Sequence, residues 1–223
     1  MHAASRGVSI LELLVATAIA LVIIAATGGM VVAQHTTSRR LQAEARLMQD
    51  LRTASELVAR DLRRAGHWSA AAASAVRRGD EAVSANPHAA IAPASGPSSA
   101  VALSFSTADD DGGAVDDRDR FGFRLRNGVI ELQLGARNWQ ALTDAGTLVV
   151  TAFAVEPRLD EIALATFCER PCAAAGTHCP PRLQVRSFAV TVAARSAGDA
   201  RVVRTLQSAV RVRNDVVVGS CEG

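Results

Sequence analysis

Aromatic residues are scarce in this chain of 223 residues, which has two tryptophans, six phenylalanines and no tyrosine. Proteins that bind single-stranded nucleic acid stack bases on aromatic side chains inside basic grooves. No stretch of this sequence interleaves basic and aromatic residues, and 24 Lys plus Arg against 22 Asp plus Glu give a net charge of only +2. The composition therefore argues against a chain built to bind nucleic acid specifically.

The motifs of common enzyme classes are also missing. The sequence contains no Gly-x-Ser-x-Gly, no His-Glu-x-x-His and no phosphate-binding loop. Its histidines are scattered, at positions 2, 35, 67, 88 and 178. We therefore expect no enzymatic activity and no cofactor.

Charge is absent from residues 13–33, a run of 21 residues. A helix of that length crosses the core of a bilayer, which is about 30 Å thick. The run is too long for the apolar part of a signal peptide, which has about 7 to 15 residues. Arg6 on its short side predicts a cytoplasmic N-terminus and places the rest of the chain outside the inner membrane.

Two residues at the start of this run are unusual. Gly7 lies at the junction between polar and apolar residues, and Glu12 places a carboxylate inside the apolar run. An unpaired charge there costs about 2 to 3 kcal/mol or more. Glu12 either reaches to the lipid headgroups or pairs with a positive charge. A cut after Gly7 creates such a charge, because the new amine at Val8 lies about one helical turn from residue 12.

Gly7, Glu12 and the uninterrupted apolar helix together resemble the class III leader of type IV prepilins and type II secretion pseudopilins. The resemblance implies that prepilin peptidase cuts after Gly7 and methylates the amine of Val8, although the family most often has phenylalanine at this position. It also implies that Glu12 serves subunit docking. Residues 1–7 are then the leader peptide, and residues 8–33 are the transmembrane and polymerisation helix.

Residues 34–66 predict the amphipathic second half of the same helix. Apolar residues recur every three or four positions, at Leu47, Leu51, Ala54, Val58, Leu62 and Ala65, and Gly66 is a stop signal. The run from Arg60 to Arg63, with Gly66 and Trp68 after it, resembles the PilW family of minor pilins. Similar Arg-Asp-Leu runs occur in the J-type pseudopilin. Residues 206–214 resemble the C-terminal strand of PilW-type proteins.

Residues 67–223 predict a periplasmic globular head rich in β-strands. Alternating or β-branched segments occupy residues 100–106, 120–126, 129–134, 148–155, 183–195 and 201–212. Asn127-Gly128 is the strongest hairpin signal in the chain. A long helix followed by these strands predicts an α+β fold, in which the helix packs on an antiparallel sheet as in type IV pilins.

An acidic stretch interrupts the predicted strands. Asp109, Asp111, Asp116 and Asp117 are calcium-ligand candidates, since calcium binds six to eight oxygens. The spacing does not match an EF-hand loop, which needs glycine where this chain has Ala114. A solvated hairpin loop is the favoured interpretation, because Asp and Gly are ordinary turn formers.

The cysteines are confined to the last third of the chain, at Cys168, Cys172, Cys179 and Cys221. Outside the inner membrane the surroundings are oxidising, so disulfides are expected, with the pairing left open. A zinc site that includes His178 is the alternative. Adjacent ligands at 178 and 179 are awkward for one tetrahedral site, and the prolines and glycine nearby describe a stapled loop better.

These features predict a minor pilin of a type IV pilus that contributes to assembly initiation or the tip complex. Its expected partners are prepilin peptidase, inner-membrane lipid before assembly, and other minor pilins and the major pilin through the N-terminal helix. A J-type pseudopilin of a type II secretion system is the first alternative. The second is a single-pass membrane-anchored protein whose head binds a ligand.

Overall fold

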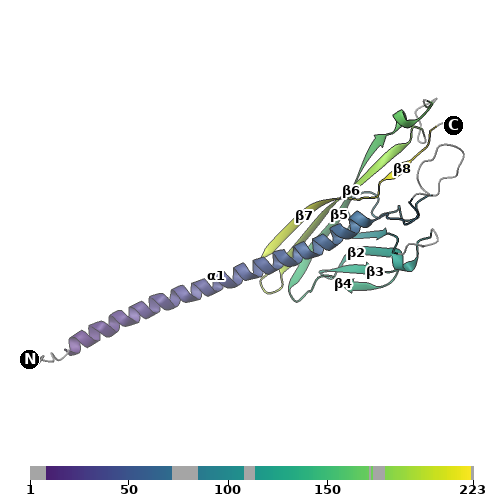
Figure 1. The fold of residues 1–223 in the computed structure, drawn as a ribbon. Coiled ribbons are helices and arrows are strands. Elements are labelled where there is room, and N and C mark those ends of the chain that lie inside the picture. Colours follow the sequence, from purple (N-terminus) through teal and green to yellow (C-terminus); the bar gives the residue numbers. More distant parts are fainter. Residues whose placement is uncertain (1–8, 72–84, 108–113, 171, 173–178, 222–223) are drawn as a thin grey trace, which may run out of the picture.

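The computed structural model describes residues 9–71, 85–107, 114–170, 172 and 179–221. One long helix, α1 (Ile10–Arg64), precedes the strands of the head (Figure 1). The described strands are β1 (Ala100–Ser104), β2 (Arg120–Arg126), β3 (Val129–Leu134), β4 (Trp139–Ala141), β5 (Leu148–Ala163), β6 (Arg182–Ser196), β7 (Val203–Arg211) and β8 (Val216–Val218). Short 3₁₀ helices are η2 (Asp117–Asp119) and η3 (Ala165–Phe167). The predicted α+β class is confirmed.

The helix has two halves with different surroundings. Its N-terminal half projects alone from the head (Figure 1), is long and apolar enough to cross a membrane, and has none of that stretch buried. Its C-terminal half packs on β6 and β7. The residues predicted to form the apolar stripe are all buried there: Leu47, Leu51, Ala54, Val58, Leu62 and Ala65. Helical periodicity therefore predicted the packed face correctly.

The described strands of the head form two four-stranded antiparallel sheets. One has the order β1-β2-β3-β4, and the other has the order β5-β6-β7 with β8 also paired to β6. Asn127 and Gly128 have φ angles of 52° and 76°, which is the left-handed geometry that a two-residue hairpin between β2 and β3 requires. The hairpin prediction is confirmed.

A single core joins the helix to both sheets. Buried side chains of α1 meet Leu103 and Phe123 from the first sheet and Phe153, Val190 and Val192 from the second. Burial of apolar surface on this scale is the main stabilising contribution to the fold. The head and the second half of the helix consequently form one folding unit.

Strand β5 runs eight residues beyond its predicted end, through Pro157 to Ala163. The backbone of Val155 exchanges two hydrogen bonds with Ser98, so the N–H and C=O groups of Val155 point away from β6. The backbone nitrogen of Pro157, two residues later, points to the same outer edge of β5. No N–H is needed there for the hydrogen bonds between β5 and β6. Proline is therefore tolerated inside this strand.

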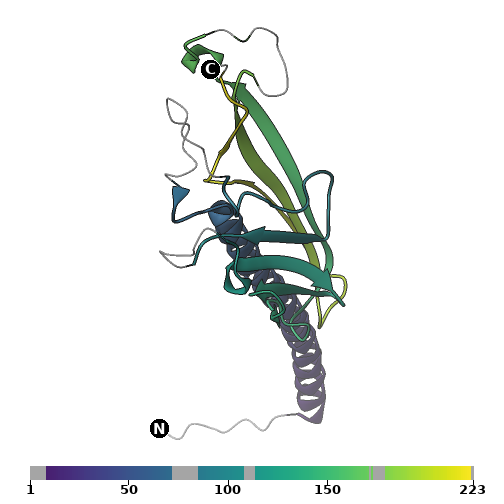
Figure 2. The same ribbon diagram turned by 90° about the vertical axis from the view of Figure 1, so that its right-hand side faces the viewer.

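The outer half of β5 (residues 156–163), residues 182–188 of β6 and β8 form a projection that we name the arm. The C-terminal part of β6, from Ser187 to Arg195, pairs with β7. Its N-terminal part, from Arg182 to Gln184, lies in the arm and pairs with β8. Figure 2 shows the arm extending beyond the C-terminal end of α1. Periodicity predicted neither β8 nor β4, because strands of three residues are too short to show an alternation.

Candidate processing and assembly site along the helix

The two residues of the predicted cleavage site, Gly7 and Val8, lie outside the described residues. The described chain begins at Ser9, which is the N-cap of α1. The backbone N–H of Ser9 donates to Oε2 of Glu12 at 3.2 Å. A glutamate at this position satisfies one of the free donors of the first turn and suits the positive end of the helix dipole. Glu12 therefore caps its own helix.

The surface around Glu12 is otherwise apolar and bare. Ile10, Leu11, Leu13 and Leu14 are 60% to 82% exposed. A continuous apolar surface of this kind marks a membrane or an interaction site in a folded protein. A lone carboxylate within it marks a functional position by default.

The helix ends in the motif that resembled the minor pilins. Asp61, Leu62 and Trp68 are buried, and Gly66 has a φ of +75° that favours glycine. The N–H of Gly66 donates to the carbonyl oxygen of Ser104 at 2.9 Å. The motif thus shapes the turn at which the chain leaves the helix and enters the head.

The second motif, at residues 206–214, meets the first at this turn. Nδ2 of Asn214 donates to the carbonyl oxygens of Ala65 at 3.0 Å and Arg64 at 3.3 Å. The N–H of Arg213 donates to the carbonyl oxygen of Arg63 at 3.1 Å. Carbonyls at a helix end lack partners within the helix, so these contacts cap it. Both motifs are visible in the sequence, but nothing in it signals their contact, which joins residues about 150 positions apart.

Arg186 reinforces the same junction from the arm. Its guanidinium donates to the carbonyl oxygen of Asn214 at 2.9 Å and to that of Ala89. Burial lowers the pKa of Arg186, and the nearby carboxylate of Asp215 opposes that shift. Sequence reasoning missed this residue, because nothing distinguishes it from other strand arginines.

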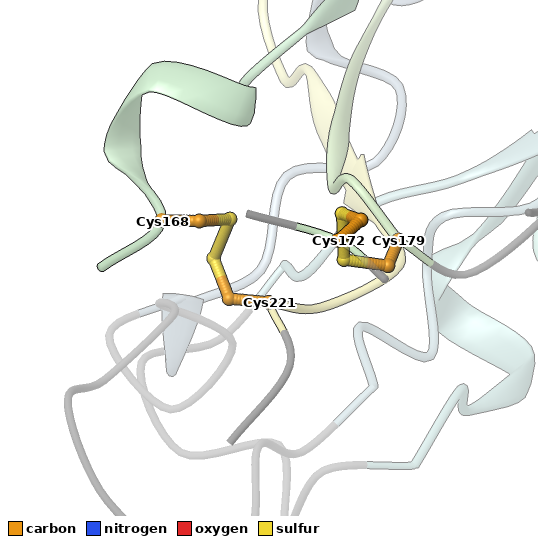
Figure 3. The surroundings of a disulfide bond; sticks show 4 residues. All are labelled: Cys168, Cys172, Cys179 and Cys221. Atoms are coloured by element: carbon orange, nitrogen blue, oxygen red, sulfur yellow. A yellow bond between two sulfur atoms is a disulfide. The ribbon is translucent and has the colours of Figure 1, made fainter. Parts of the chain in front are cut away.

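All four cysteines form disulfides at the tip of the arm (Figure 3). Cys168 pairs with Cys221, 53 residues later, and Cys172 pairs with Cys179. No cysteine is left as a thiolate for zinc, and His178 lies outside the described residues. The first disulfide fastens the segment after β8 to η3, and the second closes the short loop between Cys172 and Cys179.

The acidic stretch is only partly described, since Asp109 and Asp111 lie outside the described residues. Asp116 accepts from Arg118 at 3.0 Å, and Asp117 lies 3.9 Å from Arg120. Within the described ranges, no group of three or more His, Cys, Asp or Glu is arranged to hold a metal ion. The two described calcium candidates each face an arginine.

Asp119, at the end of the acidic stretch, has a structural role. Its carboxylate accepts from Oγ1 of Thr107 at 2.6 Å, from the N–H of Thr107 at 3.2 Å and from the N–H of Asp116 at 3.1 Å. Burial raises the pKa of Asp119, but these hydrogen bonds and the charge of His88 outweigh it and lower the pKa overall. Asp119 thus joins the two ends of the acidic stretch.

A bare apolar helix whose second half packs on an antiparallel β head defines a pilin-like or pseudopilin-like protein. The model of the family described as prepilin peptidase-dependent protein B matches residues 40–212, well over half of the chain. The chain belongs to this family. The match begins after the apolar run, so it is independent of the leader motif. No curated protein and no solved structure matches the chain.

Proposed function

We propose that this chain is a minor pilin of a type IV pilus that acts in assembly initiation or in the tip complex. The observation that carries the proposal is the division of α1. Its second half completes the core of the head, whereas none of the described side chains in its first half is buried, and Leu, Ile and Val are exposed there on all sides. A surface of this kind is stable only in lipid or against other such helices.

In this proposal the N-terminal helix has one role before assembly and another after it. Before assembly, residues 8–33 anchor it in the inner membrane, with a cytoplasmic N-terminus and a periplasmic head. Prepilin peptidase cuts after Gly7 and methylates Val8. Afterwards the same helix packs against the helices of other minor pilins and the major pilin.

Glu12 sets the register of the helix in the second of these roles. In the single chain its carboxylate is bonded to the N–H of Ser9 and is otherwise exposed. In a bundle of helices, the amine created at Val8 and a neighbour's Glu12 neutralise each other. A buried pair of this kind adds little stability but disfavours every register in which the charges do not meet.

We propose a structural subunit rather than an enzyme or a ligand receptor. The buried carboxylate of Asp119 accepts from Thr107 and Asp116 and so closes a loop, and the half-buried Asn214 caps the helix. The Arg-Asp-Leu run at residues 60–62 also favours a J-type pseudopilin as the second candidate.

Intact mass of the membrane-extracted protein tests the proposal. In cells with active prepilin peptidase, we expect a chain that begins at Val8 and carries one added methyl group. Cells without the peptidase should yield the chain from Met1. A chain from Met1 in both strains contradicts the proposal.

The role in a pilus is tested separately from processing. We expect a tagged chain in sheared pili, and we expect loss of the gene to reduce piliation while secretion of folded proteins continues. The opposite result, with normal piliation and impaired secretion, assigns the chain to a pseudopilus instead.

A further inference from the structure

The arm has two bare edges in the described part of the chain. Beyond the bridge between Ser98 and Val155, no described residue pairs with the outer edge of β5. On the other side, β8 pairs with β6 alone. Unpaired strand edges are templates for pairing with another chain. The arm can therefore be extended at either edge.

A row of aliphatic side chains crosses the arm. Leu183 of β6 pairs with Ile162 of β5 on one side and with Val217 of β8 on the other. Side chains alternate along a strand, so Leu183 lies on the face opposite the buried Phe188. Ile162 is 53% exposed and Val217 is 39% exposed. The row thus ends in an exposed aliphatic side chain at both edges.

Strand direction decides which edges can meet. Both β5 and β8 are antiparallel to β6, so they run in the same direction, and β5 rises away from the free end of α1 (Figure 1). Pairing two β5 edges antiparallel reverses one copy together with its anchor. Copies anchored in one membrane share an orientation, so β5 of one copy meets β8 of the next as a parallel strand.

Charge favours the same arrangement. Ser187 of β6 pairs with Arg158 of β5 on one side and with Arg211 of β7 on the other. When two copies stand at the same height above the membrane, the connection between β7 and β8 of one copy is therefore level with the middle of the outer half of β5 in the other. The exposed Arg213 of one copy is then level with the exposed Asp160 of the other. Arg158 faces Arg211 of the second copy, whose charge is offset by Asp215 at 2.8 Å.

We propose that the arm is a side-to-side contact between copies of this chain. The outer half of β5 in one copy adds to β8 of the second copy, Ile162 packs on Val217 of the second copy, and Asp160 faces its Arg213. The two surfaces differ, so the contact is heterologous and continues from copy to copy as an open row. It rests on the proposed function only in that the copies share a membrane.

The contact is too small to hold free molecules together. A stable interface buries about 1,200 to 2,000 Å², and the arm offers a few residues from each copy. Anchors held in one membrane raise the effective concentration of each copy for its neighbour, so a weak contact suffices there. The test therefore uses the full chain in its membrane.

Two differently tagged full-length chains, one with Ile162→Cys and one with Val217→Cys, are co-expressed, and the membranes are oxidised. We expect a disulfide-linked dimer that carries both tags, and no dimer when either variant is expressed alone. Leu134→Cys, which replaces a residue 39% exposed on the other sheet, is the matched control for Val217→Cys and should give no dimer with Ile162→Cys. Thiol labelling of the unreduced, unfolded protein before oxidation should find one thiol per chain.

Charge reversal gives a second measurement. Asp160→Arg in the chain that carries Ile162→Cys should lower the cross-linked yield about 2- to 5-fold, and Arg213→Asp in the other chain should restore it. A dimer formed by Ile162→Cys alone, or an equal yield with the control, overturns the proposal. No dimer from chains that begin at Val8 and enter pili overturns the arm contact alone. Mixed dimers of chains still beginning at Met1 support the contact while the proposed function fails.

Discussion

Asp119 stabilises the head through the hydrogen bonds that its carboxylate accepts. Three hydrogen bonds reach its buried carboxylate, and the donors stand on both sides of the acidic stretch. Asp119→Ala leaves these donors without a partner, and we expect it to lower the free energy of unfolding by about 1 to 3 kcal/mol. Urea unfolding of the full chain in detergent micelles, followed by the fluorescence of Trp68 and Trp139 in the head, measures the change. An unchanged midpoint contradicts the role.

The same carboxylate predicts a dependence on pH. Its pKa in the folded head lies below the ordinary value of 3.8, so the folded state binds the proton less tightly than the unfolded chain. This stabilisation is fully present above the unfolded pKa and is lost as pH falls through the folded pKa. The difference in stability between the wild type and Asp119→Asn should therefore shrink between about pH 5 and pH 3. A difference that grows on acidification contradicts the assigned direction.

Gly66 differs from most glycines in the chain in having both a left-handed backbone and close neighbours. A Cβ atom there lies 3.1 Å from Nη2 of Arg186, whereas one at Gly96, with a φ of +66°, meets nothing within 4 Å. The left-handed backbone alone costs alanine about 1 to 2 kcal/mol. Gly66→Ala should therefore destabilise the head more than Gly96→Ala does. An equal loss in the free energy of unfolding for both variants would show that the side chain of Arg186 can move away from the new methyl group without a loss of stability.

Among the elements, the second half of α1 has the clearest energetic role. Leu51 is fully buried at the centre of its packed face, and Leu41, ten residues earlier, is 61% exposed. Leu51→Ala should cost about 2 to 5 kcal/mol, while Leu41→Ala should change stability by no more than about 0.5 kcal/mol. Unfolding of both variants in the same micelles provides the comparison. Equal effects contradict the division of the helix.

The two disulfides at the arm should contribute unequally. In the chain-entropy description, a bond that closes 53 residues is worth about 4 kcal/mol and one that closes 7 residues about 2 kcal/mol. We expect the double serine variant of Cys168 and Cys221 to unfold at lower urea than that of Cys172 and Cys179. Thiol labelling of the unreduced, unfolded wild type should find no free cysteine. The reverse ranking contradicts the entropic account.

Local pattern predicted the elements more completely than the contacts between them. The 3.6-residue period identified the packed face of α1, and Asn127-Gly128 identified the hairpin. Each of these signals is carried by residues only a few positions apart in the sequence. The outer half of β5 was missed because its side chains are exposed and show no alternation of polarity. Its strand geometry comes from pairing with β6, from Glu156 with Ala189 to Ala163 with Arg182, between residues far apart in the sequence.

The candidate site divides in the same way. Glu12 and the four cysteines stand out in sequence by residue type and compartment. The disulfide pairing, the capping of α1 by Asn214 and the role of Arg186 depend on which segments the sheet brings to the end of the helix. No local signal in the sequence carries that information.

At the scale of the whole molecule, the two halves of one helix have different surroundings. Its buried second half fixes it to the head through apolar packing and through Glu44, whose carboxylate lies 2.5 Å from Nη2 of Arg204 on β7. The described side chains of residues 10–42 are all exposed. Folding of the head and packing of the anchor therefore depend on different residues and can be disturbed separately.

Glu12→Gln tests this separation. Glutamine can still accept from the N–H of Ser9, so the helix cap is preserved and only the charge is removed. We expect unchanged urea unfolding of the head, unchanged cleavage after Gly7 and normal insertion, because the anchor becomes more apolar. Assembly should fail, since the ammonium at Val8 then lacks a counter-charge among the packed helices. Loss of one partner of a buried pair costs about 3 to 5 kcal/mol, enough to lower occupancy of the assembled state more than about a hundredfold.

The measurement is the amount of the Glu12→Gln chain in sheared pili relative to its amount in the inner membrane. Leu51→Ala is the complementary variant, because it weakens the head and leaves the charge pair of the anchor untouched. If the two regions are independent, the first variant loses assembly at full head stability and the second loses head stability with its anchor still inserted. Wild-type incorporation of Glu12→Gln at equal membrane levels shows that Glu12 only reaches to the headgroups and caps its own helix.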